Sequence, residues 1–349
     1  LYTVQDAMNA VALLAPIDYN QTIQLCEGIE LRFTDVGHLL GSSCIEVWIT
    51  EDGVSKKIVF SGDVGNIDQP IIKDPQHVDA ADYLVIESTY GNRVHSTVKP
   101  DYIKELTRVL RETFAKGGNV VIPSFAVGRT QELLYFIREI KENNLLPEYQ
   151  NFEVYVDSPL ANEATTIFNE HIYDCFDEEA MTLVKKGINP LMFPGLKTSI
   201  TSDDSKAINF DEDCKVIISA SGMCDAGRIK HHLKHNLWNP NNTILFVGYQ
   251  AIGTLGRALI EGATEVKLFG ETVAVGAEIR QMPGISGHAD KDHLTAWVQG
   301  MKQKPKRIFV VHGQDQVTDN FAAHLKEVVG VDAVAPYSGD IYDLQQNLC

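Results

Sequence analysis

Side chains of the kinds that bind zinc stand where predicted strands end. Asp63 follows the apolar run Ile58–Phe60, and His312 follows another apolar run near the end of the chain. His38 lies between two predicted strands with glycines on both sides, and His288 precedes a predicted helix. Each residue alone is explained as well by a turn or a structural role. Together they predict a zinc site of histidine nitrogens and a bridging carboxylate.

An acid at the end of a predicted strand is expected to orient one of these histidines. Glu87 ends the predicted strand Tyr83–Ile86 and opens the run Glu-Ser-Thr-Tyr-Gly. A carboxylate that accepts the second ring N–H of a histidine fixes its tautomer. Glu87 is therefore a candidate partner in catalysis.

Gly- and Ser-rich turns that follow apolar strands are the second kind of candidate site. They lie at 123–129, 157–161, 219–223 and 248–257, where helix N-termini and arginines suit phosphate groups. The candidate phosphate ligands are Ser124, Arg129, Ser219, Ser221, Arg228 and Arg257. For any single turn, ordinary strand-to-helix chemistry is at least as good an explanation. Neither a Walker A pattern nor a Rossmann glycine fingerprint occurs.

Two other residue patterns predict no site. His231 and His235 have a spacing that can bind zinc on a helix, but position 232 is not the Glu of a metalloprotease motif, so a polar helix face is expected. The six cysteines form no CxxC pair. Free buried thiols and a cytoplasmic, reducing location are therefore expected.

The helices and strands that must position these residues follow one another differently in different parts of the chain. Strands dominate residues 29–90, with a hairpin turn at Glu51–Gly53, and strands and helices then alternate, which favours a parallel sheet covered by helices. The predicted strands are Ile29–Thr34, Ser43–Thr50, Lys56–Ser61, Tyr83–Glu87, Asn119–Pro123, Phe152–Val156, Lys215–Ser219, Thr243–Val247, Arg307–Val311 and Ala333–Pro336. The predicted helices are Pro100–Lys116, Arg129–Glu142, Leu160–Glu170, Asp225–His235, Lys291–Lys302 and Val317–Val328.

Length and composition bound the class of protein. The 349 residues suggest about two domains. With 44% apolar and 22% charged residues the composition is that of a globular protein, and no apolar run is long enough for a membrane span. The formal charge of −17 disfavours indiscriminate nucleic-acid binding. A local basic cleft or bound metal ions would still allow a nucleic-acid enzyme.

The motifs in this order resemble the β-CASP branch of the metallo-β-lactamase-fold nucleases. Asp-Val-Gly-His38 and Ser-Gly-Asp63 resemble two of the family's metal motifs. The segments at Glu87, His288 and His312 resemble β-CASP motifs A, B and C, and the Gly/Ser turns resemble those of the inserted domain.

The resemblance implies a metallo-β-lactamase αβ/βα sandwich, incomplete at its N-terminus, with an inserted Rossmann-like α/β domain. The expected boundaries are 1–92 for the first part, 93–281 for the inserted β-CASP domain and 282–349 for the C-terminal return.

The resemblance also implies an activity, which is hydrolysis of phosphodiester bonds in single-stranded RNA, with single-stranded DNA and homo-oligomers left open. His38, Asp63 and His312 would bind two zinc ions, with Asp63 shared between them. His288 would donate a proton to the leaving oxygen and be oriented by Glu87. The inserted domain would hold RNA phosphates and close over the metals.

The chain lacks one motif that the family uses. No stretch can be read as His-x-His-x-Asp-His, and the first residue is Leu1, so we expect an N-terminally truncated chain. Two protein ligands for each zinc hold the ion poorly. This chain alone is therefore expected to bind zinc weakly and to be nearly inactive.

Two other functions fit the same residues. One is a non-catalytic scaffold of an RNA-processing assembly, against which the retained histidines and acids argue. The other is a hydrolase of small esters, against which the large middle region with phosphate-suited turns argues.

Overall fold

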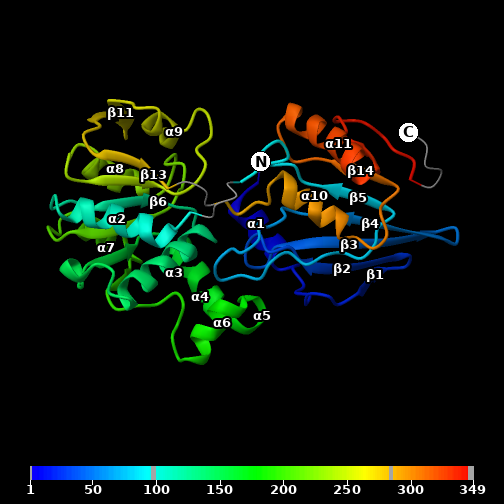
Figure 1. Cartoon of the computed structure of the whole chain (residues 1–349), viewed down its shortest axis with the longest axis horizontal. Coiled ribbons are helices and arrows are strands. Elements are labelled where there is room, and N and C mark those ends of the chain that lie inside the picture. Colours follow the sequence, from blue (N-terminus) through cyan, green and yellow to red (C-terminus); the bar gives the residue numbers. More distant parts are fainter. Residues whose placement is uncertain (1, 96–99, 283–285, 345–349) are drawn as a thin grey trace. The chain divides into compact units, whose positions relative to one another are not determined.

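A computed structural model describes residues 2–95, 100–282 and 286–344 of the chain. It divides the chain into two compact units, each built around its own sheet (Figure 1). The first unit comprises Leu1–Ile67, Asp74–Val94 and His288–Cys349, and the second comprises Asp68–Lys73 and His95–Gly287. Both units are α/β, as the order of the predicted elements indicated.

The first unit holds a seven-stranded sheet in the order β1-β2-β3-β4-β5-β14-β15. The strands are β1 (Ile23–Cys26), β2 (Ile29–Asp35), β3 (Ser43–Glu51), β4 (Val54–Phe60), β5 (Tyr83–Ile86), β14 (Arg307–Val310) and β15 (Asp332–Val334). Neighbours are antiparallel from β1 to β4 and parallel from β4 to β15.

A two-residue hairpin joins β3 to β4. Glu51 pairs with Val54, and the two residues between them have positive φ angles, +49° at Asp52 and +76° at Gly53. This is the backbone that an Asp-Gly hairpin turn requires. The predicted turn at Glu51–Gly53 is thus confirmed.

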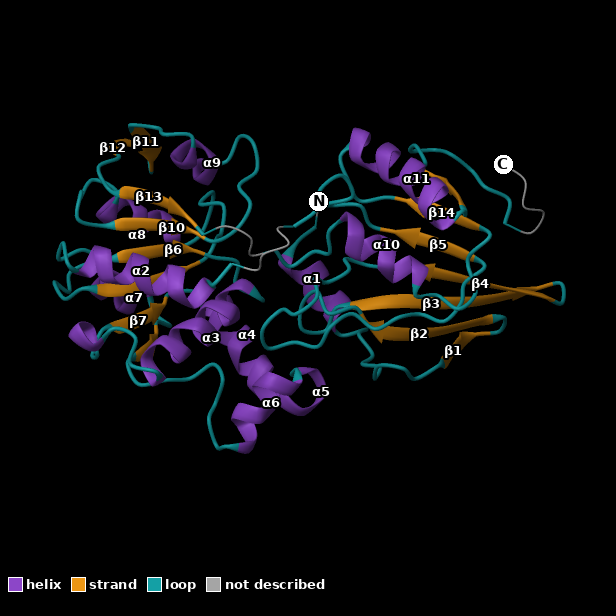
Figure 2. Cartoon of the chain, viewed as in Figure 1, coloured by secondary structure: helices purple, strands orange, loops and turns teal. Residues whose placement is uncertain are grey.

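Two helices pack on the parallel half of the first unit's sheet (Figure 2). They are α10 (Lys291–Gln299) and α11 (Asp315–Val329). Trp297 and Phe321 from these helices are buried in one cluster with Leu84 and Ile308 from β5 and β14. This core holds the ends of both strands in fixed positions, because buried side chains cannot shift without opening a cavity.

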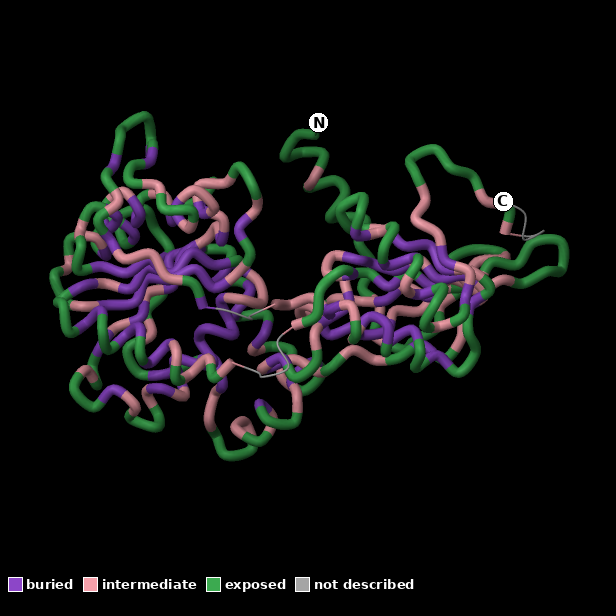
Figure 3. The backbone as a smooth tube through the Cα atoms, turned by 45° about the horizontal axis from the view of Figure 1, so that its top comes forward, coloured by how far each residue is buried: buried purple, intermediate pink, exposed green. Residues whose placement is uncertain are grey.

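The second unit is built on a six-stranded parallel sheet in the order β13-β10-β6-β9-β7-β8. Every residue of β6, β9 and β10 is buried, which is expected of a parallel sheet covered on both faces (Figure 3). The strands are β6 (Val120–Pro123), β7 (Glu153–Val156), β8 (Leu196–Thr198), β9 (Lys215–Ser219), β10 (Thr243–Phe246) and β13 (Glu278–Gln281), with a separate hairpin of β11 (Glu265–Leu268) and β12 (Glu271–Ala274).

The remaining helices belong mainly to the second unit. They are α2 (Tyr102–Phe114), α3 (Arg129–Glu142), α4 (Pro159–Glu170), α5 (Ile172–Cys175), α6 (Glu178–Lys185), α7 (Ser202–Ile208), α8 (Ile229–Asn236), α9 (Leu255–Ile260) and a 3-10 turn at Pro147–Tyr149, whereas α1 (Val4–Val11) lies in the first unit. Among the described residues, no helix combines the length and the apolar character that a membrane crossing needs.

One predicted helix begins later than expected. The helix predicted from Asp225 begins at Ile229, because Cys224 and Gly227 adopt positive φ angles of +67° and +79°. A side chain at Gly227 would place its Cβ 2.4 Å from the carbonyl oxygen of Ala220. The turn therefore folds back on the end of β9 before the helix can start. The helix predicted to reach Lys302 likewise ends at Gln299, and Gly300 caps it.

Candidate functional site

Four loops of the first unit meet at one edge of its sheet. Strand β3 is antiparallel to both β2 and β4, so β2 and β4 run in the same direction as β5 and β14. The loops that follow these four strands carry His38, Asp63, Glu87 and His312. The carboxyl ends of strands that run in one direction share one edge, which is where such sheets place their sites.

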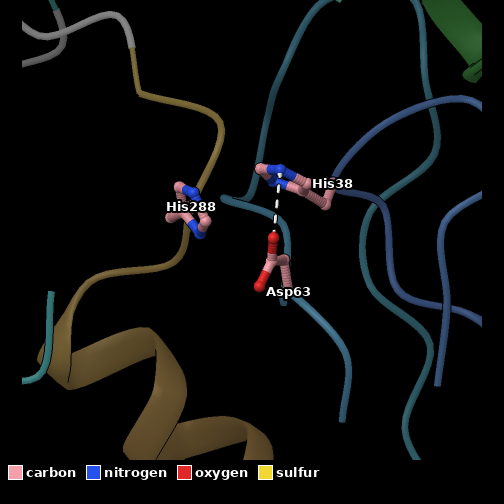
Figure 4. Close-up of side chains that lie close together, drawn as sticks. All are labelled: His38, Asp63 and His288. Carbon is pink, nitrogen blue, oxygen red and sulfur yellow. Dashed lines mark ion pairs between the residues drawn. The ribbon is translucent and has the colours of Figure 1, made fainter. Parts of the chain in front are cut away.

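Asp63 stands between two histidines at this edge. Its Oδ2 lies 3.9 Å from His38 Nε2, and its Oδ1 lies 3.1 Å from His312 Nδ1. Figure 4 shows the Asp63 carboxylate facing the His38 ring, with His288 beside them. The Asp63 side chain is 39% exposed, so its carboxylate remains open to a ligand.

The half-buried His288 pairs with the buried Glu87 beside these residues. His288 Nδ1 lies 3.2 Å from Glu87 Oε1, and the His288 ring lies 4.3 Å from the His38 ring. Backbone N–H groups of Val64 and Thr89 also donate to the Glu87 carboxylate. These contacts fix Glu87 in one orientation.

The pKa values of this pair move apart. Burial raises the pKa of Glu87, but the hydrogen bond and charge of His288 and the hydrogen bonds from Thr89 together lower it by more, and the net direction is down. Burial lowers the pKa of His288, but the hydrogen bond and charge of Glu87 and the charge of Asp63 together raise it by more, and the net direction is up. An ionised acid next to an imidazole is the arrangement that holds a proton on Nδ1.

Small residues let the loops approach one another. Gly65 pairs with His288 in an isolated bridge, and its N–H donates to Val36 O over 2.8 Å. A Cβ at Gly65 would lie 2.0 Å from the carbonyl oxygen of Gly37, so only glycine fits. The close approach brings the loop of His38 against the loop of Asp63.

His312 adopts a backbone conformation that is uncommon outside glycine. Its φ is +52°, and its carbonyl accepts the N–H of Ser88 over 3.4 Å. Thr89 Oγ1 lies 3.3 Å from His312 Nδ1. The turn directs the imidazole away from the strand and toward Asp63.

The donor atoms fit zinc at two neighbouring positions that share Asp63. The ligand atoms of His38, Asp63 and His288 lie within 4.8 Å of one another, and so do those of Asp63, Glu87 and His312. Imidazole and carboxylate are zinc ligands, whereas Ca²⁺ and Mg²⁺ prefer oxygen alone. Glu87 and His288 are hydrogen-bonded to each other, whereas Asp63 faces both His38 and His312.

The predicted phosphate ligands lie at the carboxyl edge of the second unit's sheet or on the helices that follow. Ser124 and Ser219 are buried and bonded within the fold, and Ser221 is half-buried. Arg129 and Arg257 pair with acids on their own helices, at Glu132 and Glu261. Arg228 belongs to the internal network around Asp157, which is described next.

The buried cluster around Asp157 was not predicted from the sequence. Asp157 follows β7, and its carboxylate accepts hydrogen bonds from Ser199 Oγ, from Ser205 Oγ over 2.6 Å and from Arg228 over 2.7 Å. His232 Nε2 lies 2.5 Å from Asp157 Oδ2. Burial raises the pKa of Asp157, but these four partners together bring it well below its usual range.

The spacing of His231, His232 and His235 along their helix could have indicated this cluster. His232 is completely buried, whereas His231 stacks on Phe269 and His235 faces Phe210 at the surface. The polar face predicted for His231 and His235 leaves position 232 on the inner side of the helix.

The sequence matches two family models. A model of the Beta-Casp domain matches residues 130–259, and a model of the Zn-dependent metallo-hydrolase RNA specificity domain matches residues 272–336.

Curated proteins resemble nearly the whole chain. Ribonuclease TTHA0252 of Thermus thermophilus is 35% identical over 89% of this chain and 69% of its own. An RNase J-like protein of Methanocaldococcus jannaschii is 31% identical over 97% of this chain and 77% of its own. Transcription termination factor FttA of Methanosarcina mazei is 30% identical over 92% of this chain, which spans only 50% of that factor.

Proposed function

Because this chain belongs to the β-CASP family of metallo-β-lactamase-fold nucleases, we propose that the protein hydrolyses phosphodiester bonds of RNA with the help of zinc. The meeting of His38, Asp63, His288 and His312 at one sheet edge supports this proposal most directly. The names of relatives as a ribonuclease and an RNase J-like protein favour RNA as the substrate.

We propose that His38 and His312 each hold one of two zinc ions and that Asp63 bridges them. Zinc, when bound, would lower the pKa of a water molecule and neutralise charge on the phosphate. The remaining donors would come from the His-x-His-x-Asp-His motif of the family, which this sequence does not contain.

His288 is proposed as the proton donor to the leaving oxygen. Glu87 Oε1 faces Nδ1 of His288, and the other ring nitrogen, Nε2, is proposed as the atom that delivers the proton. A group that must deliver a proton in the transition state needs this fixed orientation. Ser221, Arg129 and Arg257 are proposed to contact RNA phosphates in the inserted domain, residues 93–281. Ser124, Ser219 and Arg228, predicted for the same role, are instead engaged in hydrogen bonds within the fold.

The direct test is cleavage of labelled RNA, single-stranded DNA and a chromogenic ester, side by side, by a protein that also carries the missing zinc motif. RNA cleavage that requires zinc supports the proposal. Cleavage of the ester alone would instead assign the site to small-ester hydrolysis, and no cleavage of any of the three would favour a scaffold.

The variant His288→Ala separates the proton donor from the metal ligands. It should reduce turnover by about 100-fold or more while two zinc ions remain bound. Loss of zinc from this variant would contradict the role of proton donor.

The 349-residue chain by itself is proposed to bind zinc weakly and to be nearly inactive. Without the His-x-His-x-Asp-His motif, His38 and Asp63 would be the ligands of one ion and Asp63 and His312 those of the other, and two protein ligands hold zinc poorly. Elemental analysis after dialysis measures the zinc content. Two tightly held zinc ions for each chain would refute this part of the proposal.

A further inference from the structure

Three loops at the carboxyl edge of the second unit's sheet are bonded into one surface. Gln250, after β10, donates from Nε2 to the carbonyl oxygens of Gly222, over 2.9 Å, and of Tyr249, over 3.1 Å. The N–H of Gly256 donates to Met223 O over 3.0 Å. The loop after β9 is thereby tied to the loop after β10.

The loop after β6 packs on the same glycine. A Cβ at Gly222 would lie 3.2 Å from two ring carbons of Phe125, so the Phe125 ring rests directly on that backbone. The carbonyl of Phe125 accepts the hydroxyl of Thr130 over 2.7 Å, which fixes the loop to the start of α3. Gly222 thus joins the loops of Phe125 and Tyr249.

Two aromatic rings are exposed on these anchored loops. Phe125 and Tyr249 are each 48% exposed. Because the loop holds each ring in place, one face of the ring stays in contact with water. A ligand that covers this apolar face gains binding energy. Such rings are the stacking platforms on which proteins bind single-stranded nucleic acid, since every base offers a flat face.

Positive charge accompanies the rings. Arg257 lies on α9, the helix that follows the loop of Tyr249. The hydrogen bond from Arg257 to Glu261 uses only Nε. Its two amino groups have no partner among the residues that the structure describes, so they remain able to contact a phosphate. Base stacking and phosphate contact together are the chemistry of an unpaired strand rather than of a duplex.

We propose that Phe125 and Tyr249 form a base-stacking surface for single-stranded RNA in the second unit. This inference rests on the proposed function, because it gives the RNA substrate a binding surface separate from the zinc ligands. The surface reads no particular base, so binding there tolerates any sequence.

The test measures binding without hydrolysis. The full chain, in EDTA, is titrated into two fluorescein-labelled strands of equal length, an oligouridylate and an abasic analogue with the same phosphates. Fluorescence anisotropy gives the ratio of their dissociation constants. Stacking on two rings predicts that the oligouridylate binds about 25-fold more tightly or better, because each stacked base contributes about 5-fold or more.

Matched variants locate the effect. Phe125→Ala and Tyr249→Ala should each lower that ratio by about 5-fold or more, and Phe125→Trp should preserve it. Tyr173→Ala is the control, since Tyr173 is 78% exposed on α5 of the same unit. Circular dichroism confirms that each variant is folded.

Equal binding of both strands, or a ratio that the Phe125 and Tyr249 variants leave unchanged, would overturn the stacking surface. Neither result would affect the hydrolytic proposal, which is judged by zinc-dependent cleavage. The absence of binding to either strand would also overturn the stacking surface, whatever the cleavage assay shows.

Discussion

Replacing Asp157 by Asn should destabilise the second unit strongly without changing its shape. The Asp157 side chain is completely buried and accepts hydrogen bonds from two hydroxyls, Arg228 and His232. Asn has the same size, but its NH₂ group must face two of these donors and its charge is lost. Removing one partner from a buried ion pair costs about 3–5 kcal/mol of unfolding free energy.

The expected loss is at the lower end of that range, about 3 kcal/mol, because Arg228 is 22% exposed and can be partly rehydrated. For a unit of this size, a loss of this amount lowers the Tm by roughly 6–12 °C. Thermal and urea unfolding followed by circular dichroism measure both quantities. The control is Asp203→Asn, whose side chain is 92% exposed and pairs only with Lys206, and it should change stability by less than about 0.5 kcal/mol.

The pH dependence gives a second measurement on the same variant. The folded state lowers the pKa of Asp157, so its stabilising effect is complete above the unfolded pKa of about 4 and is lost as the pH falls further toward the folded value. The natural chain should therefore lose more unfolding free energy than Asp157→Asn between pH 5 and pH 3, on the order of 1 kcal/mol. Equal stabilities at pH 7, or parallel curves at low pH, would refute the reasoning.

Three further outcomes are expected. Gly65→Ala should lower the Tm of the first unit by several degrees, because its Cβ would lie 2.0 Å from the Gly37 carbonyl oxygen. An unchanged melting curve would show that the loop moves aside at no cost and would contradict the prediction. Glu46→Gln should cost about 2–3 kcal/mol, because the buried Glu46 carboxylate binds both Arg32 and Lys57; urea unfolding checks this, and a loss below 0.5 kcal/mol would contradict it. Micromolar zinc should raise the Tm of the 349-residue chain by less than about 1 °C in a calorimetric scan, since a ligand below its Kd stabilises little, and a rise of several degrees would indicate tight sites.

Local sequence patterns predicted most elements, and where they failed the cause was a tertiary contact. Arg129–Glu142 and Lys215–Ser219 have the bounds that were expected, because continuous apolar or amphipathic runs set them. The start of α8 was wrong by four residues. The chain at Gly227 packs against the carbonyl of Ala220, and this contact moves the helix start to Ile229. No local sequence pattern indicates that contact.

By itself the sequence determined that Asp63 and His312 follow apolar strands and that Glu87 ends another. The physical reason is that strand ends are a local property of hydrophobic runs, and strands that run in one direction share an edge. Residue types then indicated zinc, and ordered motifs indicated the family.

Only the tertiary structure decided which side chains pair. Glu87 and His288 are 201 residues apart, and the family resemblance, not any pattern along the chain, indicated that their side chains pair. Asp157 and His232 are 75 residues apart in sequence and share a buried contact. Such pairs depend on strand order and on close backbone approach, as at Gly65, and no periodicity along the chain encodes either.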